Sequence, residues 1–212
     1  MVNEVYLVQG TARILDSSVL NAYNQSIKSY NSERARKSLE IFNRDNGDLT
    51  GSSPLGAIEL VNSGLLPEGA KLAMRGDLKN ATCKDASFLR GHYTDFGLVL
   101  RTAGDSYKPN DLLAKRLALQ LKQRGIKLSN GKLIPLDAVS LVENEESAYG
   151  LVVNFKEDVG AIRDLSDFKW DCTRDEGLAC ALFDEGQFWD SNFECLATSG
   201  SIGRMVIINC KR

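Results

Sequence analysis

The sequence predicts an α+β fold in a single domain, because helical patterns dominate the first half of the chain and strand patterns dominate the second. The 212 residues suit one large domain or two small ones, and no repeat or low-complexity linker divides them. Apolar residues make up 43% of the chain and charged residues 25%, which are ordinary values for globular proteins. A domain of this length buries about 70% of the surface of its unfolded chain, so its core needs no disulfide or metal for support.

The expected elements begin with a short apolar strand at Val5–Val8. Residues 17–42 carry apolar side chains at helical spacing after Asp16, a candidate N-cap, so a helix is expected there. The polar segment 43–53 contains glycine and is expected to be a loop. A further short helix is expected at 81–90.

Two helices have clear boundaries in the sequence. The first starts at Pro54 after the N-cap candidate Ser53 and stops at Gly64, because glycine suits the left-handed conformation that ends a helix. The second is expected at 110–124, with its asparagine as the cap and the following glycine as the stop. The inward-facing residues of the two helices are Leu55, Ile58, Val61, Leu113, Ala114, Leu117, Ala118 and Leu121. The second helix is expected to be covered on both sides, since two leucines lie on its opposite flank, Leu112 and Leu119.

Strand patterns follow in the second half of the chain. The apolar run Leu98–Arg101 predicts one strand. A Ser-Asn-Gly turn between Ile126–Leu128 and Lys132–Leu141 predicts a hairpin, and the turn ENEES leads to another strand at Tyr149–Phe155. The final apolar run, Gly203–Cys210, is expected to form a buried strand that pairs centrally in a sheet.

Charge and hydropathy argue against several classes of partner. The net charge is −2 and no long block of like charge occurs, so neither nucleic acid nor anionic lipid is an expected partner. No apolar run reaches about 18 residues, so membrane insertion is not expected. The first thirty residues lack the basic start and apolar run of a signal peptide, which makes the cytoplasm the default expectation.

The cysteines do not indicate a metal site. No CxxC pair occurs, and His92 is the only histidine, so neither a zinc site nor any other metal or cofactor is expected. The thiols are interpreted as reduced and partly buried, although one disulfide that uses Cys210 stays an open alternative. The five cysteines are Cys83, Cys172, Cys180, Cys195 and Cys210.

The segment Gly177–Arg204 has a composition unlike the rest of the chain, because aromatic residues alternate with short polar and acidic ones. Aromatic anchors among adaptable polar groups are typical of recognition surfaces. Burying all of these rings would also bury neighbouring carboxylates, so we expect part of a patch formed by Phe183, Phe188 and Phe193 to reach solvent. The alternative is that the aromatic residues pack in the core between bulged strands.

The order of GLACALF, G-x-x-W-D-S, L-x-x-S and S-x-G-R-M-V-I-I in this segment resembles the C-terminal region of variable proteins made by diversity-generating retroelements, in particular the archaeal kind. The resemblance implies a C-type lectin-like fold of the formylglycine-generating-enzyme type, in which a fixed frame supports substituted loops. It implies that Trp189 packs under the loops and that Arg204 pairs with a carboxylate or with backbone carbonyl groups. The frame residues that it implies are Leu178, Leu182, Gly186, Trp189, Ser191, Leu196, Ser199, Gly203 and Arg204.

The positions between the frame residues are, on this resemblance, the variable ones. They form a ligand-binding region at about 178–204, and the implied function is binding without catalysis, with an unknown macromolecule, expected to be a protein, as the ligand. The implied variable residues are Cys180, Phe183, Asp184, Glu185, Gln187, Phe188, Asp190, Asn192, Phe193, Glu194, Cys195, Thr198, Gly200, Ser201 and Ile202.

Three other functions stay open. Formylglycine-generating enzymes share the implied fold and work through paired cysteines that bind copper, and Cys195 and Cys210 imitate such a pair; no nucleophile motif such as GxSxG accompanies them. A calcium-dependent carbohydrate-binding lectin would use oxygen ligands such as Asp184, Glu185 and Asp190, but its Glu-Pro-Asn or Gln-Pro-Asp partner motif is missing. The third is a structural domain without a ligand.

Overall fold

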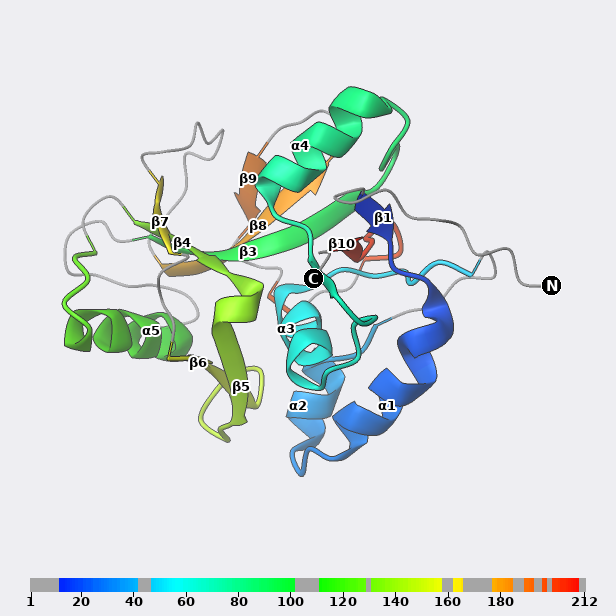
Figure 1. Cartoon of the computed structure of the whole chain (residues 1–212). Coiled ribbons are helices and arrows are strands. Elements are labelled where there is room, and N and C mark those ends of the chain that lie inside the picture. The colour runs from blue at the N-terminus through cyan, green and yellow to red at the C-terminus, as the bar shows by residue number, and fades with distance from the viewer. Residues whose placement is uncertain are drawn as a thin grey trace.

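The structure is mixed α and β with antiparallel sheets in a single domain (Figure 1). The expected α+β class is confirmed at this level. The computed structural model describes nine stretches of the chain, the seventh of them by its backbone: 12–41, 47–101, 111–128, 131–157, 162–165, 177–184, 189–192, 196–197 and 200–209. The expected strand Val5–Val8 lies outside these residues.

A five-stranded antiparallel sheet, in the order β7-β4-β3-β8-β9, forms the centre of the described chain. Its longest pair is β3 (Tyr93–Arg101) with β8 (Gly177–Asp184), whose register is interrupted by a bulge between Asp95 and Gly97. The strand expected at Leu98–Arg101 is therefore present, but it begins earlier, at Tyr93. The other strands of the sheet are β4 (Lys132–Pro135), β7 (Arg163–Asp164) and β9 (Trp189–Asn192).

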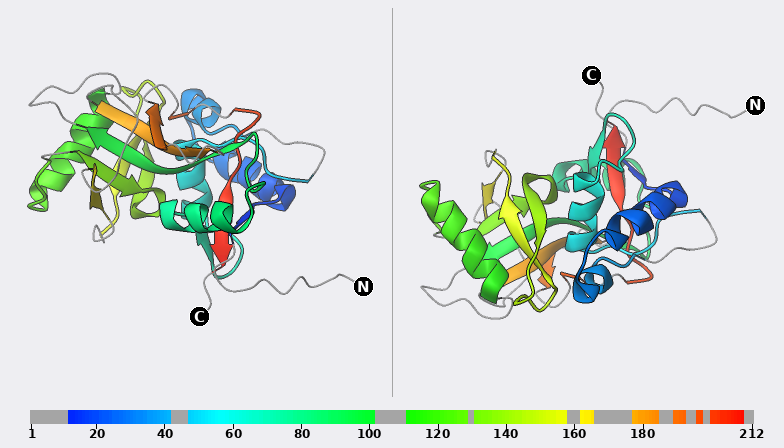
Figure 2. Two further views of the ribbon diagram at one scale, coloured as in Figure 1. Left: turned by 90° about the horizontal axis from the view of Figure 1, so that it is seen from above. Right: turned by 90° about the horizontal axis from the view of Figure 1, so that it is seen from below.

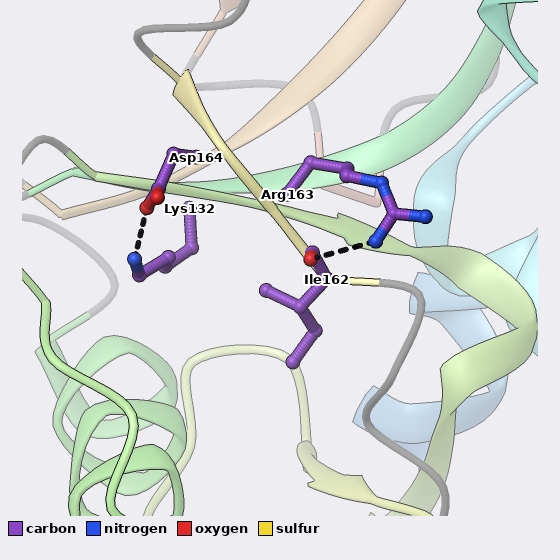
Figure 3. Close-up of polar contacts among 4 residues, drawn as sticks. All are labelled: Lys132, Ile162, Arg163 and Asp164. Carbon is purple, nitrogen blue, oxygen red and sulfur yellow. Dashed lines mark hydrogen bonds and ion pairs between the residues drawn. The ribbon is translucent and has the colours of Figure 1, made fainter.

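An ion pair fastens the short strand β7 to β4 at one edge of this sheet (Figure 3). Lys132, a buried residue of β4, binds the partly exposed carboxylate of Asp164 in β7. In the same strand, Nη1 of Arg163 donates to the carbonyl oxygen of Ile162 at 3.2 Å. Breaking such a pair on one side would leave a charge in the interior, so this contact is structural.

A second sheet brings together strands from both ends of the described chain. β10 (Val206–Asn209) lies in its centre, antiparallel to β1 (Ala12–Ile14) on one side and to β2 (Ala70–Leu72) on the other. The central pairing expected for Gly203–Cys210 is confirmed over Val206–Asn209. Gly203 and Arg204 precede the strand and form isolated bridges, and Cys210 lies outside the described residues.

The expected hairpin around the Ser-Asn-Gly turn is wrong. Ile126–Leu128 is not a strand, and β4 pairs with β3 and β7 instead. The expected strand 132–141 is divided by the 3-10 helix η2 (Leu136–Ala138), since Pro135 has no N–H to continue the ladder. The turn ENEES does join a hairpin, formed by β5 (Val139–Glu143) and β6 (Leu151–Phe155).

The single helix expected at 17–42 is divided into three pieces, η1 (Ser17–Val19), α1 (Leu20–Lys28) and α2 (Glu33–Ser38). Asp16 caps the first piece, as expected, by accepting from the N–H of Ser18 at 2.8 Å. The break arises at Ser32, whose extended backbone and side chain form a new N-cap that accepts from the N–H of Ala35.

The helix α3 (Pro54–Asn62) confirms its expected boundaries. The hydroxyl of Ser53 accepts from the N–H of Gly56 at 3.1 Å, and Gly64 follows the helix with a φ of +68°. The helix α4 (Arg75–Lys84) starts before the expected 81–90 and stops earlier, because Asp77 accepts from the N–H of Met74 and so fixes an earlier start.

The helix α5 (Asp111–Gln123) ends before Gly125, which has a φ of +73°. Its inward-facing leucines and alanines are buried, and Leu112 packs against the same core. Leu119 is 56% exposed, so the expectation of cover on both sides is wrong for this flank. Asn110, the expected cap, lies outside the described residues.

Apolar side chains occupy both faces of the five-stranded sheet. In Figure 1, α4 lies on one side of the sheet, and α3, α5 and the β5–β6 hairpin lie on the other. Leu98 of β3 and Leu178 of β8 belong to the cluster under α3 and α5, whereas Val99 and Ala179 belong to the cluster under α4. Strands that are buried on both faces read as continuous apolar runs, as β8 does in GLACALF.

Candidate functional site

The C-terminal segment 177–204 contributes a strand to the middle of the five-stranded sheet and then returns to the start of β3, the longest strand of that sheet. β8 lies between β3 and β9, and residues 200–204 then pack across the beginning of β3. Gly203 forms a parallel bridge with Tyr93, and Arg204 forms an antiparallel bridge with Thr50. The segment 200–204 is thus held between β3 and the residues that precede α3.

Gly203 occupies a position that is too narrow for a side chain. A Cβ atom there would lie 2.5 Å from the backbone nitrogen of Ser52 and 3.0 Å from the carbonyl carbon of Gly51. The N–H of Gly51 also donates to the carbonyl oxygen of Gly203 at 3.0 Å. Because backbone atoms surround it, this close approach requires glycine.

Arg204 is almost completely buried, at 1% exposure, and organises the turn that precedes it. Its Nη1 donates to the carbonyl oxygens of Ser201 at 3.2 Å and of Gly203 at 2.7 Å. Its Nη2 lies 3.3 Å from Nε2 of His92. The contacts to backbone carbonyl groups expected of Arg204 are therefore present, and charge-assisted bonds of this kind are stronger than neutral ones.

Tyr93 links this turn to the interior. Its hydroxyl accepts from the N–H of Gly200 and donates to the carbonyl oxygen of Ser52, both at 3.3 Å. Its N–H donates to the carbonyl oxygen of Ile202 at 3.3 Å. The hydroxyl of Ser52 accepts from the N–H of Asp95 at 2.9 Å. A continuous series of hydrogen bonds thus runs from the turn to the bulge in β3.

Asp95 is a buried acid at that bulge. Burial raises its pKa to about 7, while hydrogen bonds from the side chains of Ser52 and Cys180 oppose the shift. These three residues come from three separate segments of the chain. Cys180 therefore serves as an internal partner of Asp95, and its thiol has no access to solvent.

Two of the expected ligand-binding residues are wrongly placed by the sequence argument, because Cys180 and Phe183 are both fully buried. Both lie on β8, which is covered on its two faces. Phe183 packs in the cluster under α4, together with Phe96 and Ile208. Its acidic neighbour Asp184 ends the strand and is only half-buried, so burial of the ring does not bury a carboxylate with it.

Among the described side chains of this segment, the exposed ones lie near its C-terminal end. Ser201 and Ile202 are exposed, the latter at 50%, while Gly200 and Asp184 are half-buried. Among the expected frame residues with described side chains, the buried ones are Leu178, Leu196, Gly203 and Arg204, whereas Leu182 is half-buried.

The remaining expected residues belong to β9 or lie outside the described part of the chain. β9 is described by its backbone, in which Trp189 lies opposite Phe183. The expected residues whose side chains fall in this backbone-only strand are Trp189, Asp190, Ser191 and Asn192. The expected residues outside the described part of the chain are Glu185, Gly186, Gln187, Phe188, Phe193, Glu194, Cys195, Thr198 and Ser199.

A hollow of about 980 Å³ lies elsewhere, between α2 and the β5–β6 turn. The carboxylate of Glu143 accepts from the N–H of Ser32 at 2.7 Å and from Nδ2 of Asn31 at 3.0 Å. Nη1 of Arg34 donates to the carbonyl oxygens of Glu145 and Ser147. These hydrogen bonds join α2 to the β5–β6 hairpin, so the role of these polar groups is structural.

No local pattern in the sequence indicated Ser52, Tyr93 and Asp95, which support the turn 200–204. Each lies far from that turn along the chain, and the bridges of Tyr93 with Gly203 and of Thr50 with Arg204 bring these segments to it. Within the described ranges, no group of three or more His, Cys, Asp and Glu side chains is arranged to hold a metal ion. None of the helices in those ranges is long and apolar enough to cross a membrane.

Comparison with known proteins finds no matching family model, no similar curated protein and no similar solved structure.

Proposed function

We propose that the chain is a non-catalytic binding protein with a C-type lectin-like fold of the formylglycine-generating-enzyme type, whose segment at about 178–204 supplies a diversified surface for a protein ligand. The main support for the proposal is the set of hydrogen bonds that fixes the turn 200–204. Every hydrogen bond to Gly200, Ser201 and Ile202 described above uses their backbone atoms. Side chains at 201 and 202 are therefore free to change without loss of the contacts that fix the turn.

The groups that hold the turn come from residues outside the proposed variable positions. Tyr93 binds the backbone at 200 and 202, and Arg204 binds the backbone at 201. A rigid base of this kind keeps the entropy cost of binding low for any side chains that it presents. It therefore supports a surface that varies while its framework stays constant.

Burial and a steric contact exclude three residues from the proposed variable surface. Cys180 and Phe183 are withdrawn from it because both are buried. Gly200 is also a poor position for substitution, since a Cβ atom there would lie 2.9 Å from the hydroxyl oxygen of Tyr93. The proposed variable surface then consists of Asp184, Glu185, Gln187, Phe188, Asp190, Asn192, Phe193, Glu194, Cys195, Thr198, Ser201 and Ile202.

The first test compares surface with framework. We expect the double substitution Ser201→Tyr with Ile202→Arg to change the free energy of unfolding by no more than about 0.5 kcal/mol, because exposed side chains lose little packing. Gly203→Ala should lower it by about 1–3 kcal/mol, because an added methyl group meets backbone atoms. Chemical denaturation measures both. Equal destabilisation by the two changes would contradict the division into surface and framework.

The second test addresses binding and diversification. A display library randomised at the proposed variable positions should yield folded binders to a chosen globular protein, and a library randomised at an equal number of exposed positions on α1, α2 and α4 should not. In the genome, the proposal requires a neighbouring reverse transcriptase gene and a near-copy of the segment's coding sequence that differs mainly at adenines. Absence of that copy would reject diversification, and failure of the first library would reject the binding surface.

A further inference from the structure

The outer surface of α5 is strongly basic although the chain as a whole has a net charge of −2. Residues 112–127, which cover α5 after its first residue and the segment that follows it, contain five Lys or Arg and no Asp or Glu. Lys122, Arg124 and Lys127 are exposed, and none of the three forms an ion pair with a residue that the structure describes. The positive charge of these three side chains is therefore not neutralised by the described residues, and it favours an anionic partner.

A shallow hollow of about 480 Å³ lies on this surface, between α5 and the end of β6. Oδ1 of Asn154, in β6, accepts from Nε of Arg116 at 2.6 Å and from Nε2 of Gln120 at 3.1 Å. Oε1 of Gln120 in turn accepts from the N–H of Phe155 at 2.8 Å. These contacts fix Arg116 through Nε and leave both of its terminal nitrogens without a hydrogen-bond partner among the described residues.

A second guanidinium group borders the same hollow. Arg124 lies over the ring of Phe155, 5.8 Å from its centroid, and its Nη1 donates to the carbonyl oxygen of Gln120 at 3.3 Å. Arg124 directly follows the last residue of α5 and lies eight positions after Arg116. Eight positions correspond to about 12 Å along a helix axis. Two positioned guanidinium groups at this spacing suit two carboxylates on one partner, because each can be bound in a bidentate manner.

The exposed side chain of Leu119 favours a protein over a nucleic acid as the anionic partner. It borders the same hollow and is 56% exposed. A phosphate backbone offers no apolar group for this leucine, and the net negative charge of the chain opposes approach to a nucleic acid. A protein segment can present an apolar side chain between two carboxylates, and apolar anchors inside a charged rim are usual in protein interfaces.

We propose that the outer surface of α5 is a docking site for an acidic segment of a partner protein, in which an apolar side chain meets Leu119 and flanking carboxylates meet Arg116 and Arg124. This surface is separate from the turn 200–204. The turn pairs with Tyr93 at the first residue of β3 and leads into β10, whereas α5 lies well away from β10 in Figures 1 and 2. The two surfaces can therefore be occupied at the same time.

The test uses a fluorescently labelled helical peptide with two glutamates about two turns apart and a leucine midway between them. The full chain should bind it saturably, with an affinity that falls as salt concentration rises. Leu119→Ser, and separately the pair Lys122→Gln with Arg124→Gln, should each weaken binding by about tenfold or more. Because all three side chains are exposed, circular dichroism should show unchanged folding for these variants.

Two controls separate this site from general attraction and from the proposed binding surface of the C-terminal segment. The pair Lys28→Gln with Lys79→Gln removes exposed cations of α1 and α4, and it should leave peptide binding unchanged. The substitutions at Ser201 and Ile202 should also have no effect, so this test can fail or succeed independently of the function proposed above. The inference is overturned if the peptide does not bind saturably, or if the α5 variants bind it as well as the native chain does. It is also overturned if duplex DNA or phosphatidylserine vesicles bind more tightly than the peptide.

Discussion

Asp95 carries its carboxyl group in the interior, where β3, β8 and the segment before α3 meet. Burial raises its pKa to about 7, although hydrogen bonds from Ser52 and Cys180 favour the charged form. Between the unfolded value of 3.8 and about pH 7, the folded chain keeps this proton and the unfolded chain loses it. The contribution of Asp95 to the free energy of unfolding is therefore highest below the unfolded pKa and falls as the pH rises to about 7.

We predict that Asp95→Asn removes this dependence on pH. Above about pH 7, the variant should be more stable than the native chain by up to about 4 kcal/mol, because a neutral amide replaces a buried charge. Urea denaturation at a series of pH values measures the effect. Asp85→Asn is the matched control: hydrogen bonds from Ser87 lower the pKa of the exposed Asp85, so its contribution changes below the window in question. A native chain whose stability stays constant across the window, relative to Asp95→Asn, would contradict the prediction.

At the scale of the residue, Gly203 and Arg204 lie in tight contacts as expected, whereas Cys180 and Phe183 are buried instead of exposed. The motif that contains Gly203 and Arg204 pointed to structural positions, and both lie in tight backbone contacts. Phe183 was assigned to a surface because acidic residues follow it, but strand pairing places its ring in the core. The environment of Asp95 was not foreseen, since it depends on Ser52 and Cys180 from distant parts of the chain.

At the scale of the element, the sequence was sufficient to predict a helix whose capping and stop residues lie at its own two ends. Ser53, Pro54 and Gly64 marked α3 correctly, because caps and stops act on their own helix. Strand partners were not predictable in the same way. A tight turn favoured pairing between Ile126–Leu128 and the following strand, but β4 pairs with β3 instead. That choice depends on contacts with residues far away in the sequence, which no local pattern contains.

The cap of α3 gives a prediction at this scale. Ser53 is fully buried, and its hydroxyl is the acceptor for the N–H of Gly56 at 3.1 Å. Ser53→Ala should lower the free energy of unfolding by about 1–2 kcal/mol, because the N–H loses its acceptor in the interior. Thermal and chemical denaturation measure the change. Ser87→Ala, which removes an exposed hydroxyl bound to Asp85, should stay within about 0.5 kcal/mol of the native chain, and a similar loss in both variants would count against the capping role.

At the scale of the whole molecule, the two apolar clusters share their strands. β10 and the residue that precedes it, Met205, alternate between them. Met205 and Ile207 belong to the cluster under α3 and α5, whereas Val206 and Ile208 belong to the cluster under α4. The sequence indicated a buried final strand, but it did not indicate two cores. A continuous apolar run shows that both faces are covered without showing that each face has a separate cover.

Because β10 enters both clusters, we predict that the described chain unfolds as one cooperative unit. Ile207 is fully buried in one cluster and its neighbour Ile208 is 5% exposed in the other, so they form a matched pair on a single strand. Each substitution, Ile207→Ala or Ile208→Ala, should lower the free energy of unfolding by about 2–5 kcal/mol through lost transfer energy and an unfilled cavity. In each variant, far-ultraviolet and near-ultraviolet circular dichroism should report the same transition midpoint, as two-state unfolding requires. Two separate transitions, with Ile207→Ala shifting one and Ile208→Ala shifting the other, would mean that the two clusters are independent and that β10 does not couple them.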